Sequence, residues 1–445
     1  MASISNFVKR WVRNARDITL NELKRIFTDG GVMIIFFIGG LLYPLLYNAI
    51  YYRGQLEDMP VAVVDQSGGQ YSRRYVRELD ATRECAVTRK CADLREAERL
   101  MQQGDIHGII LIPKGFDEAI VRGEQGTIST YADMSSFLYY KNVTMGTSYV
   151  MLDEVHAIQG ERYSAAGFTD EEARTLISPV GYGENMPYNR SMSYTIFFIS
   201  AALMLVIQQT LFYGSTLLSG TMREQNRSFA SLPARFRGIG VGRVILGRGM
   251  AYFLIYAVVG TIVLLLTPWL FHLPQKAEWT EILLLLFVFV WDCIFFSFTW
   301  GTMITRRETV FVLFLFMSPI CMFLTGFSWP MTNVPKFWQV FSYIFPSTFG
   351  CRAFINLNTA GGTIGTVAPE IIAMTIQAVV YYFLAFVAML VEHYIQSHRD
   401  KLLAMREELA RKVGFDMEKH VYEIGGEEAL EEYRRTGRIR REIPQ

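Results

Sequence analysis

The ionisable side chain in the most unusual setting is Asp292. It stands beside Trp291 in the middle of an uninterrupted apolar run at residues 282–304. A carboxylate inside a lipid bilayer costs about 2.5–3.5 kcal/mol on insertion scales, so it should face a bundle interior or a polar partner. Two interpretations stay open. Asp292 contacts a proton or a substrate, or it forms a buried structural hydrogen bond, as a protonated group, to a neighbouring helix or a second copy of the chain.

Motifs for catalysis by this chain alone are missing from its sequence. It has no Gly-x4-Gly-Lys-Ser/Thr run to cradle a phosphate and no Gly-x-Ser-x-Gly nucleophile elbow. The six histidines are scattered, and none is paired with another His or Cys at metal-ligand spacing. We therefore expect no catalytic residue, no metal site and no enzyme activity of the chain by itself.

The five cysteines are too few for a disulfide scaffold. Cys85 and Cys91 lie close together in a polar segment, whereas the other three lie in or beside apolar runs. In an oxidising compartment, Cys85 and Cys91 could bridge a small loop. Sequence spacing does not establish the required Cα separation of about 4.4–6.8 Å, so a bridge and two free thiols remain alternatives.

Composition predicts a membrane protein. Of the 445 residues 51% are hydrophobic, and a formal net charge of +1 gives no reason to expect a nucleic-acid partner. A hydrocarbon core of about 30 Å needs roughly 20 apolar helical residues. Six runs meet this length: residues 30–52 and, within 191–393, residues 191–222, 249–271, 282–304, 309–327 and 371–391. A seventh contains Pro346 and is short, which predicts a re-entrant or interfacial element at residues 328–352.

Basic residues in the short flanking segments predict the orientation of these spans. They concentrate before the first span, between the second and third (where we count Arg243 and Arg248 in the loop), and between the fourth and fifth. By the positive-inside rule, both termini are cytoplasmic. Residues 1–29 mix Trp11, Ile18 and Leu20 with basic residues, which is typical of an amphipathic helix at the inner surface. Residues 394–445 form a charged cytoplasmic tail.

The polar segment at residues 53–190 is expected to be an extracytoplasmic α/β domain. Short apolar runs predict strands at residues 61–65, 106–112 and 127–131, and a long helix is expected at 137–163. Asp93 followed by Glu96 predicts a capping box at the start of a helix that ends at Gln103. The predicted fold class is thus membrane α-helical, with six transmembrane helices and an inserted α/β domain.

Several short patterns resemble a known family. Gly326 and Phe327 are followed by Pro330 and Pro335, and Tyr343 is followed by Pro346. The permease subunits of ABC type-2 exporters carry a Gly-Phe-x-x-Pro-x-x-x-x-Pro run after the fifth span and then a Tyr-x-x-Pro motif. Residues 61–66 and 104–116 resemble the branch of that family with a large extracytoplasmic domain between the first two spans. The resemblance covers roughly residues 20–395.

This resemblance implies a role for the loop after the second span, which in the family docks on the ATPase. The family loop usually reads Arg-Glu-Lys-Glu, one variable residue, then Gly-Thr. Here only Arg223 and Glu224 match, which suggests a divergent member that could pair with a non-identical permease. The residues expected to couple to the ATPase are Arg223, Glu224, Gln225, Arg227 and Arg235. The alternative is an ordinary positively charged loop.

The resemblance also implies a substrate path. In the family, the second and fifth spans line the pathway at the axis of a permease dimer, and aromatic and Met side chains there would suit amphipathic or hydrophobic substrates. The expected lining residues are Phe198, Gln208, Gln209, Phe212, Phe316, Met322 and Phe323. The alternative is that these side chains face lipid or fill the core.

The implied function is export out of the cytoplasm or inner leaflet of a bacterial cytoplasmic (inner) membrane. A separate ATPase subunit would bind ATP and Mg, so this chain would need no cofactor of its own. Two copies, or one copy and a second permease, would form the pathway, and a periplasmic adaptor and outer-membrane channel could join them. A hypothesis of another class is a membrane-anchored receptor or scaffold whose outer domain binds a ligand without transport.

Overall fold

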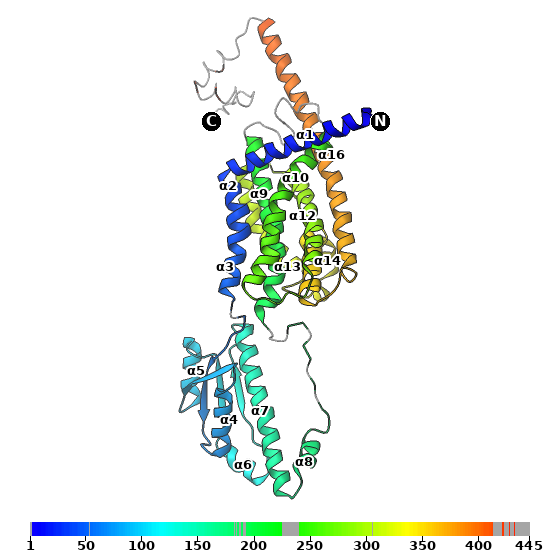
Figure 1. Ribbon diagram of the computed structural model, residues 1–445. Coiled ribbons are helices and arrows are strands. Elements are labelled where there is room, and N and C mark those ends of the chain that lie inside the picture. Colours follow the sequence, from blue (N-terminus) through cyan, green and yellow to red (C-terminus); the bar gives the residue numbers. More distant parts are fainter. Residues whose placement is uncertain are drawn as a thin grey trace. The chain divides into compact units, whose positions relative to one another are not determined.

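The chain divides into two compact units in the computed structural model, which describes residues 2–52, 54–181, 183, 185–186, 188–189, 193–224, 240–304, 306–412, 421, 427 and 431. Unit 1 comprises Met1–Tyr52 and Pro187–Gln445, and unit 2 comprises Arg53–Met186. The sequence analysis had extended the second unit to residue 190. Figure 1 shows that unit 1 is helical, whereas unit 2 combines a small sheet with helices.

Six helical segments of unit 1 are long and apolar enough to cross a membrane, which confirms the predicted count. They are Gly30–Ile50, Phe198–Glu224, Val241–Leu270, Trp279–Gly301, Arg307–Leu324 and Ala368–Glu392. The elements that carry them are α2 (Gly30–Met33), η1 (Ile34–Leu42) and α3 (Tyr43–Ile50), then α9 (Tyr194–Glu224), α10 (Val241–Thr261), η3 (Ile262–Leu266), α11 (Thr267–Leu270), α12 (Trp279–Gly301), α13 (Arg307–Leu324) and α16 (Ala368–Lys412). The helix α1 (Ala2–Thr28) lies across one end of this bundle (Figure 1).

Two spans change from α-helix to the wider π-helix just before a proline. η1 is followed by α3, which contains Pro44, and η3 is followed by α11, which contains Pro268. Proline has no N–H and its ring crowds the carbonyl of the preceding turn, so a locally widened helix accommodates it without ending the span. Both spans therefore stay continuous.

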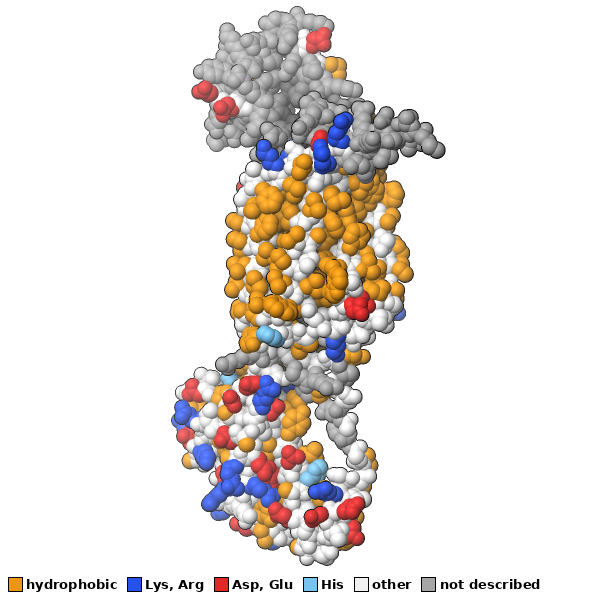
Figure 2. Space-filling view, in the orientation of Figure 1, with side chains coloured by type: hydrophobic (Ala, Val, Ile, Leu, Met, Phe, Trp, Pro, Cys, Tyr) orange, Lys and Arg blue, Asp and Glu red, His pale blue; other side chains and the backbone are white. Residues whose placement is uncertain are grey.

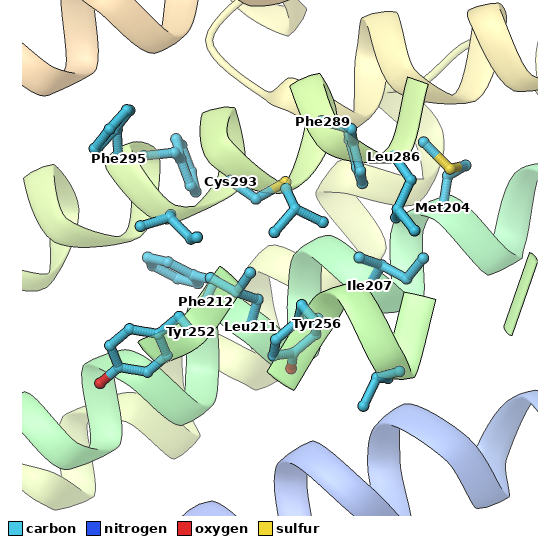
Figure 3. Packing of buried hydrophobic residues seen from close by; sticks show 14 of the residues in the cluster. Met204, Ile207, Leu211, Phe212, Tyr252, Tyr256, Leu286, Phe289, Cys293 and Phe295 are labelled. Carbon is cyan, nitrogen blue, oxygen red and sulfur yellow. The ribbon is translucent and has the colours of Figure 1, made fainter. Parts of the chain in front are cut away.

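The core of unit 1 is shared by α9, α10 and α12. Met204 and Phe212 of α9 meet Tyr256 of α10 and Phe289 of α12 in this cluster (Figure 3). The peripheral helix α13 instead leaves large apolar side chains exposed, such as Leu315. Figure 2 shows such side chains spread over unit 1. Because lipid solvates apolar surface at no cost, this pattern is that of helices inside a membrane.

The seventh apolar run folds as two short helices instead of one. They are α14 (Lys336–Ser342) and α15 (Pro346–Phe354), preceded by the 3-10 turn η4 (Met331–Asn333) and followed by η5 (Ile355–Thr359). Pro346 occupies the first turn of α15, where a missing N–H is tolerated. The α15 helix is buried, with Ser347 and Phe354 fully enclosed. The α15 part of the run is thus packed in the bundle, whereas α14 leaves Phe337 and Val340 exposed.

Unit 2 is built on a four-stranded sheet in the order β2-β1-β3-β4. Its strands are β1 (Met59–Asp65), β2 (Cys85–Lys90), β3 (Gly108–Ile112) and β4 (Ser129–Ala132), and only the β3–β4 pair is antiparallel. Its helices are α4 (Gln70–Asp80), α5 (Leu94–Gln103), α6 (Phe116–Arg122), α7 (Phe137–Ala165) and α8 (Asp170–Ile177). The three predicted strands are present, and β2 was missed.

The two faces of this sheet are covered by different helices. Val61 and Val63 pack with Tyr75 of α4 and Val143 of α7, whereas Ala62 packs with Ala97 of α5. Alternate residues of β1 thus point to opposite faces of the sheet. Both faces are buried, as expected for a central parallel strand. The Asp93 carboxylate caps α5 as predicted, but the Glu96 carboxylate accepts from the N–H of Ala92 instead of the cap residue.

Of the two alternatives left open for Cys85 and Cys91, the structure shows free thiols and no bridge, and both side chains are buried. Cys85 begins β2 and Cys91 follows its end. A strand rises about 3.3 Å per residue, so six residues separate the two Cα atoms by about 20 Å, far beyond disulfide reach. The extended strand β2, which the sequence patterns did not predict, is the physical reason why these two cysteines cannot form a bridge.

All five cysteines should be alkylated when the chain is unfolded without reductant, as intact mass spectrometry can measure. In the folded chain, Cys85 should react slowly near neutral pH, because burial raises the pKa of its thiol to about 12 and the thiolate is the nucleophile. Burial raises the pKa of Cys91 as well. A mass corresponding to three labels after unfolding would restore the disulfide hypothesis.

Candidate functional site

A buried ion pair joins α1 to α10. The Glu22 carboxylate accepts hydrogen bonds from Arg248 Nε at 2.9 Å and from the Tyr252 hydroxyl at 3.1 Å. The side chains of Glu22 and Arg248 are each only 1% exposed. Isolated charges at such depth would be strongly destabilising, so each depends on the other. Arg248, expected in a loop, instead lies within α10, which begins at Val241.

Close packing holds α1 in place around this pair. Ile18, Glu22 and Ile26 follow one another at four-residue spacing and are all buried, so they form one face of α1. The hydroxyl of Thr19 donates to the carbonyl of Gly247 at 2.7 Å. A Cβ at Gly247 would lie 2.9 Å from Ile18, so only glycine permits this approach. Leu20, expected on the apolar face, is instead exposed.

A second ion pair joins the start of the first span to the start of α13. Asp29 caps α2 by accepting from the N–H groups of Gly31 and Val32. The same carboxylate accepts from Arg307 at 2.9 Å (Nη2 to Oδ1) and 3.0 Å (Nη1 to Oδ2), and Arg307 also donates to Thr221 Oγ1. Gly31 leaves room for the guanidinium, since a Cβ there would lie 2.4 Å from Arg307 Nη2.

Arg223 and Glu224, at the end of α9, satisfy the ends of other helices. The Arg223 guanidinium donates to the carbonyls of Gly301 and Ile304 at the end of α12, and it pairs with Glu392 of α16 at 3.1 Å. Glu224 Oε1 accepts from the N–H of Arg307, the first residue of α13, at 2.7 Å. Side chains from α9 thereby provide hydrogen-bond partners for carbonyls at the end of α12 and for an N–H at the start of α13.

These contacts form one connected set, which we call the helix-end network. Arg25 links its two halves, because its Nη1 lies 3.8 Å from Glu22 and 3.2 Å from the sulfur of Met222, beside Arg223. The members of the network are Glu22, Asp29, Arg223, Glu224, Arg248, Arg307 and Glu392. None of these side chains is placed as a nucleophile. What the arrangement provides is a set of polar contacts, with Arg25 as the link, that join α1 to α9 and α10 and join α9 to α13 and α16.

Of the predicted coupling residues, Arg223 and Glu224 belong to this network. Both make contacts within the chain that the sequence analysis had not foreseen. Gln225, Arg227 and Arg235 lie outside the described residues. Glu22 and Asp29 were missed. For Glu22, the sequence contained a usable signal, because this acidic residue lies on the apolar face of the predicted amphipathic helix.

The predicted substrate-path residues do not share one surface. Phe212 is buried against Phe296, and Phe198 packs against Phe327. Phe316 and Phe323 are exposed on α13, and Met322 is partly buried beside the core. Within one chain these residues are divided between core and surface, because α9 is central and α13 peripheral, and the lining of a path at a dimer axis stays a prediction.

The two glutamines have structural roles in the core. Gln208 Oε1 accepts from the N–H of Ser347, an otherwise unused donor in the first turn of α15. Gln209 Oε1 accepts from the hydroxyl of Ser318, which lies 3.3 Å from the Tyr213 hydroxyl. These bonds tie α9 to α15 and to α13.

The family-like motif residues form the turns around α14. Gly326 has a φ of 83°, a left-handed conformation that favours glycine, and a Cβ there would lie 2.3 Å from Met331. Pro330 precedes η4, and Pro335 precedes α14. The half-exposed ring of Tyr343 stacks on Phe349. The motif thus specifies where the short helices begin and end.

Asp292 is fully buried in α12, but the predicted structural hydrogen bond is absent. Neither carboxylate oxygen accepts from a protein donor in the part of the chain that the structure describes. A second copy of the chain cannot be the partner either, because the side chain has no exposed surface. The same burial keeps a substrate away from this side chain, so of the two interpretations only a proton on the carboxyl group remains a proposal.

Asp292→Ala should raise the midpoint of thermal unfolding of the purified chain. Removing a buried polar group that has no hydrogen-bond partner recovers its desolvation penalty, about 1–3 kcal/mol. Phe289→Ala, one helical turn away, is the comparison, and it should lower the midpoint by the equivalent of about 3–5 kcal/mol. A clear loss of stability in Asp292→Ala would show that the carboxyl group has a stabilising partner.

Comparison with known proteins agrees with this architecture. The family model for ABC-2 family transporter proteins matches residues 31–387, well over half of the 445-residue chain. The matched range includes all or most of each of the six spans, the end of α9 and the Gly326 to Pro346 motif. No curated protein matches the chain in sequence. The resemblance found in the motifs is thereby confirmed, and the chain belongs to the ABC-2 transporter family as a multi-pass membrane permease.

Proposed function

We propose that the chain is the membrane-spanning subunit of an ATP-driven exporter that works with a separate ATPase. The observation that carries this proposal is the helix-end network, together with the family match. The network lies at the basic ends of the spans, which the positive-inside rule assigns to the cytoplasm. A force applied there by an ATPase would act on α1 and on the ends of α9 and α13 at once. Both termini would also be cytoplasmic.

Export requires at least two arrangements of the spans, whose balance ATP must shift. The exposed apolar face of α13, with Phe316 and Phe323, would face a second permease, identical or homologous, and the path would form between them. Aromatic walls suit amphipathic or hydrophobic cargo. Unit 2 would be extracytoplasmic, where it could receive cargo or dock an adaptor that leads to an outer-membrane channel.

Co-purification tests this proposal directly. The chain, expressed with its genomic neighbours in a bacterial inner membrane and extracted in mild detergent, should carry an ABC ATPase whose activity vanadate inhibits. A second strain carries the variant Arg307→Met, which lacks the ion pair with Asp29. The amount of ATPase that co-purifies per permease should be lower from this strain. A chain that purifies fully folded without any ATPase would favour the receptor or scaffold hypothesis.

A further inference from the structure

Unit 2 contains a hollow of about 350 Å³ at the carboxyl ends of β1 and β2, beside α4. Its apolar lining consists of Val63, Val76 and Cys91, and its basic lining consists of Arg73, Arg77 and Lys90. The volume is within the range of sites for small molecules. The carboxyl ends of parallel strands are also where α/β sheets most often bind ligands.

Three basic side chains gather at this hollow, against one carboxylate in its lining, that of Asp65. Arg73 and Arg77 are one helical turn apart on α4, and Lys90 is the last residue of β2. Within the described residues, none of the three forms an ion pair with a carboxylate. Like charges at this helical spacing repel one another. A bound anion would remove that repulsion.

The acidic groups nearby are already engaged by backbone donors. Asp65, in the lining itself, accepts from the N–H groups of Ser67 and Gly68 at 3.0 and 2.9 Å. Asp93 accepts from the N–H of Glu96 at 2.8 Å. The basic groups are therefore the ones left available to a ligand.

The N-terminus of α4 does not offer a competing anion site. Asp117 of α6 occupies it, with Oδ1 accepting from the N–H of Tyr71 at 2.6 Å and Oδ2 from the Ser67 hydroxyl at 2.7 Å. This carboxylate takes the place that a phosphate has in many α/β proteins. An anion in unit 2 would have to be bound by side chains.

We propose that this hollow binds the carboxylate or phosphate group of a small molecule whose apolar part lies on Val63, Val76 and Cys91. The planar guanidinium groups of Arg73 and Arg77 can each donate two parallel hydrogen bonds to such an oxyanion, and Lys90 adds a point charge. The site is independent of the proposed transport role, since its test requires neither an ATPase nor cargo movement.

The test is calorimetric titration of the purified full chain, in uncharged detergent, with phenyl phosphate, benzoate and neutral benzamide. Phenyl phosphate and benzoate should bind saturably, and benzamide should not. The double variant Arg73→Gln/Arg77→Gln should weaken binding by about tenfold or more, because hydrogen bonds to charged groups are lost. Arg99→Gln, an exposed arginine on α5 outside the lining, should leave the affinity unchanged.

Two further measurements show whether lost binding comes from lost folding, and whether the bound anion comes from a lipid or a soluble molecule. Because the double variant removes repelling charges, it should unfold at no lower temperature than the parent chain, so lost binding cannot be ascribed to lost folding. Benzoate should displace phenyl phosphate, since both bind the same site. Displacement by dihexanoyl phosphatidylglycerol at lower concentration than by benzoate would identify a lipid headgroup as the source of the anion, and displacement at higher concentration would identify a soluble one. Equal binding of benzamide and phenyl phosphate, or full affinity in the double variant, would overturn the proposal.

Discussion

Arg248→Met should lower the thermal-unfolding midpoint of the purified chain strongly, by the equivalent of about 3–5 kcal/mol. The substitution leaves the Glu22 carboxylate buried without its cation, and breaking a buried pair in this way is far more destabilising than losing an exposed one. Differential scanning calorimetry in detergent measures the effect. Transport should fall with it, because α1 is no longer held to α10.

Two variants make this prediction specific. Arg16→Met removes an exposed arginine whose pair with Asp17 lies at the surface, and should change stability by less than about 1 kcal/mol. The double variant Glu22→Leu/Arg248→Met removes both charges and should recover most of the lost stability, as apolar replacements of buried pairs often do. Equal midpoints for Arg16→Met and Arg248→Met would contradict the assignment of a buried pair.

Glu224→Lys should reduce ATP-driven transport by about tenfold or more. Loss of a helix cap costs about 1 kcal/mol, and a positive charge beside the first turn of α13 and beside Arg307 adds repulsion. Each 1.4 kcal/mol corresponds to a factor of ten in a rate or an equilibrium. Transport and ATPase activity in proteoliposomes, with the co-purified ATPase present, measure the effect.

The isosteric variant Glu224→Gln separates the hydrogen bond from the charge. Its amide oxygen can still accept from the N–H of Arg307, so transport should remain within about twofold of the parent chain. Glu308→Lys is the matched control, because it makes the same charge change on the first turn of α13 at an exposed residue. If Glu308→Lys impaired transport as severely as Glu224→Lys, local charge alone would explain the loss and the cap would have no specific role.

Much of the architecture was predictable from short-range patterns. A span must be apolar over its whole length because lipid offers its backbone no hydrogen bonds, and so hydropathy alone located six spans. The strands β1 and β3, buried on both faces, appear as continuous apolar runs. In contrast, β2 has the sequence Cys-Ala-Val-Thr-Arg-Lys and lies at a sheet edge, so its polar residues conceal it.

The helix-end network was predictable only in part. Arg223 and Glu224 match a family motif, but nothing in that motif indicates that they bond to α12, α13 and α16. Glu22 and Arg248 are 226 residues apart and were assigned to a surface helix and a loop. An ion pair forms only when folding brings two side chains together. The periodicity within either segment carries no information about that contact.

The sequence by itself thus determined the number of spans, the inserted α/β unit and the family, because each depends on local composition or on short motifs. Only the tertiary structure decided which charges are paired, which helices Gln208 and Gln209 bond to, and that Cys85 and Cys91 stay apart. Those properties depend on contacts between distant segments, where the low polarity of the interior makes every unpaired polar group costly. That cost makes Glu22 and Arg248, 226 residues apart in the chain, depend on each other in the folded bundle.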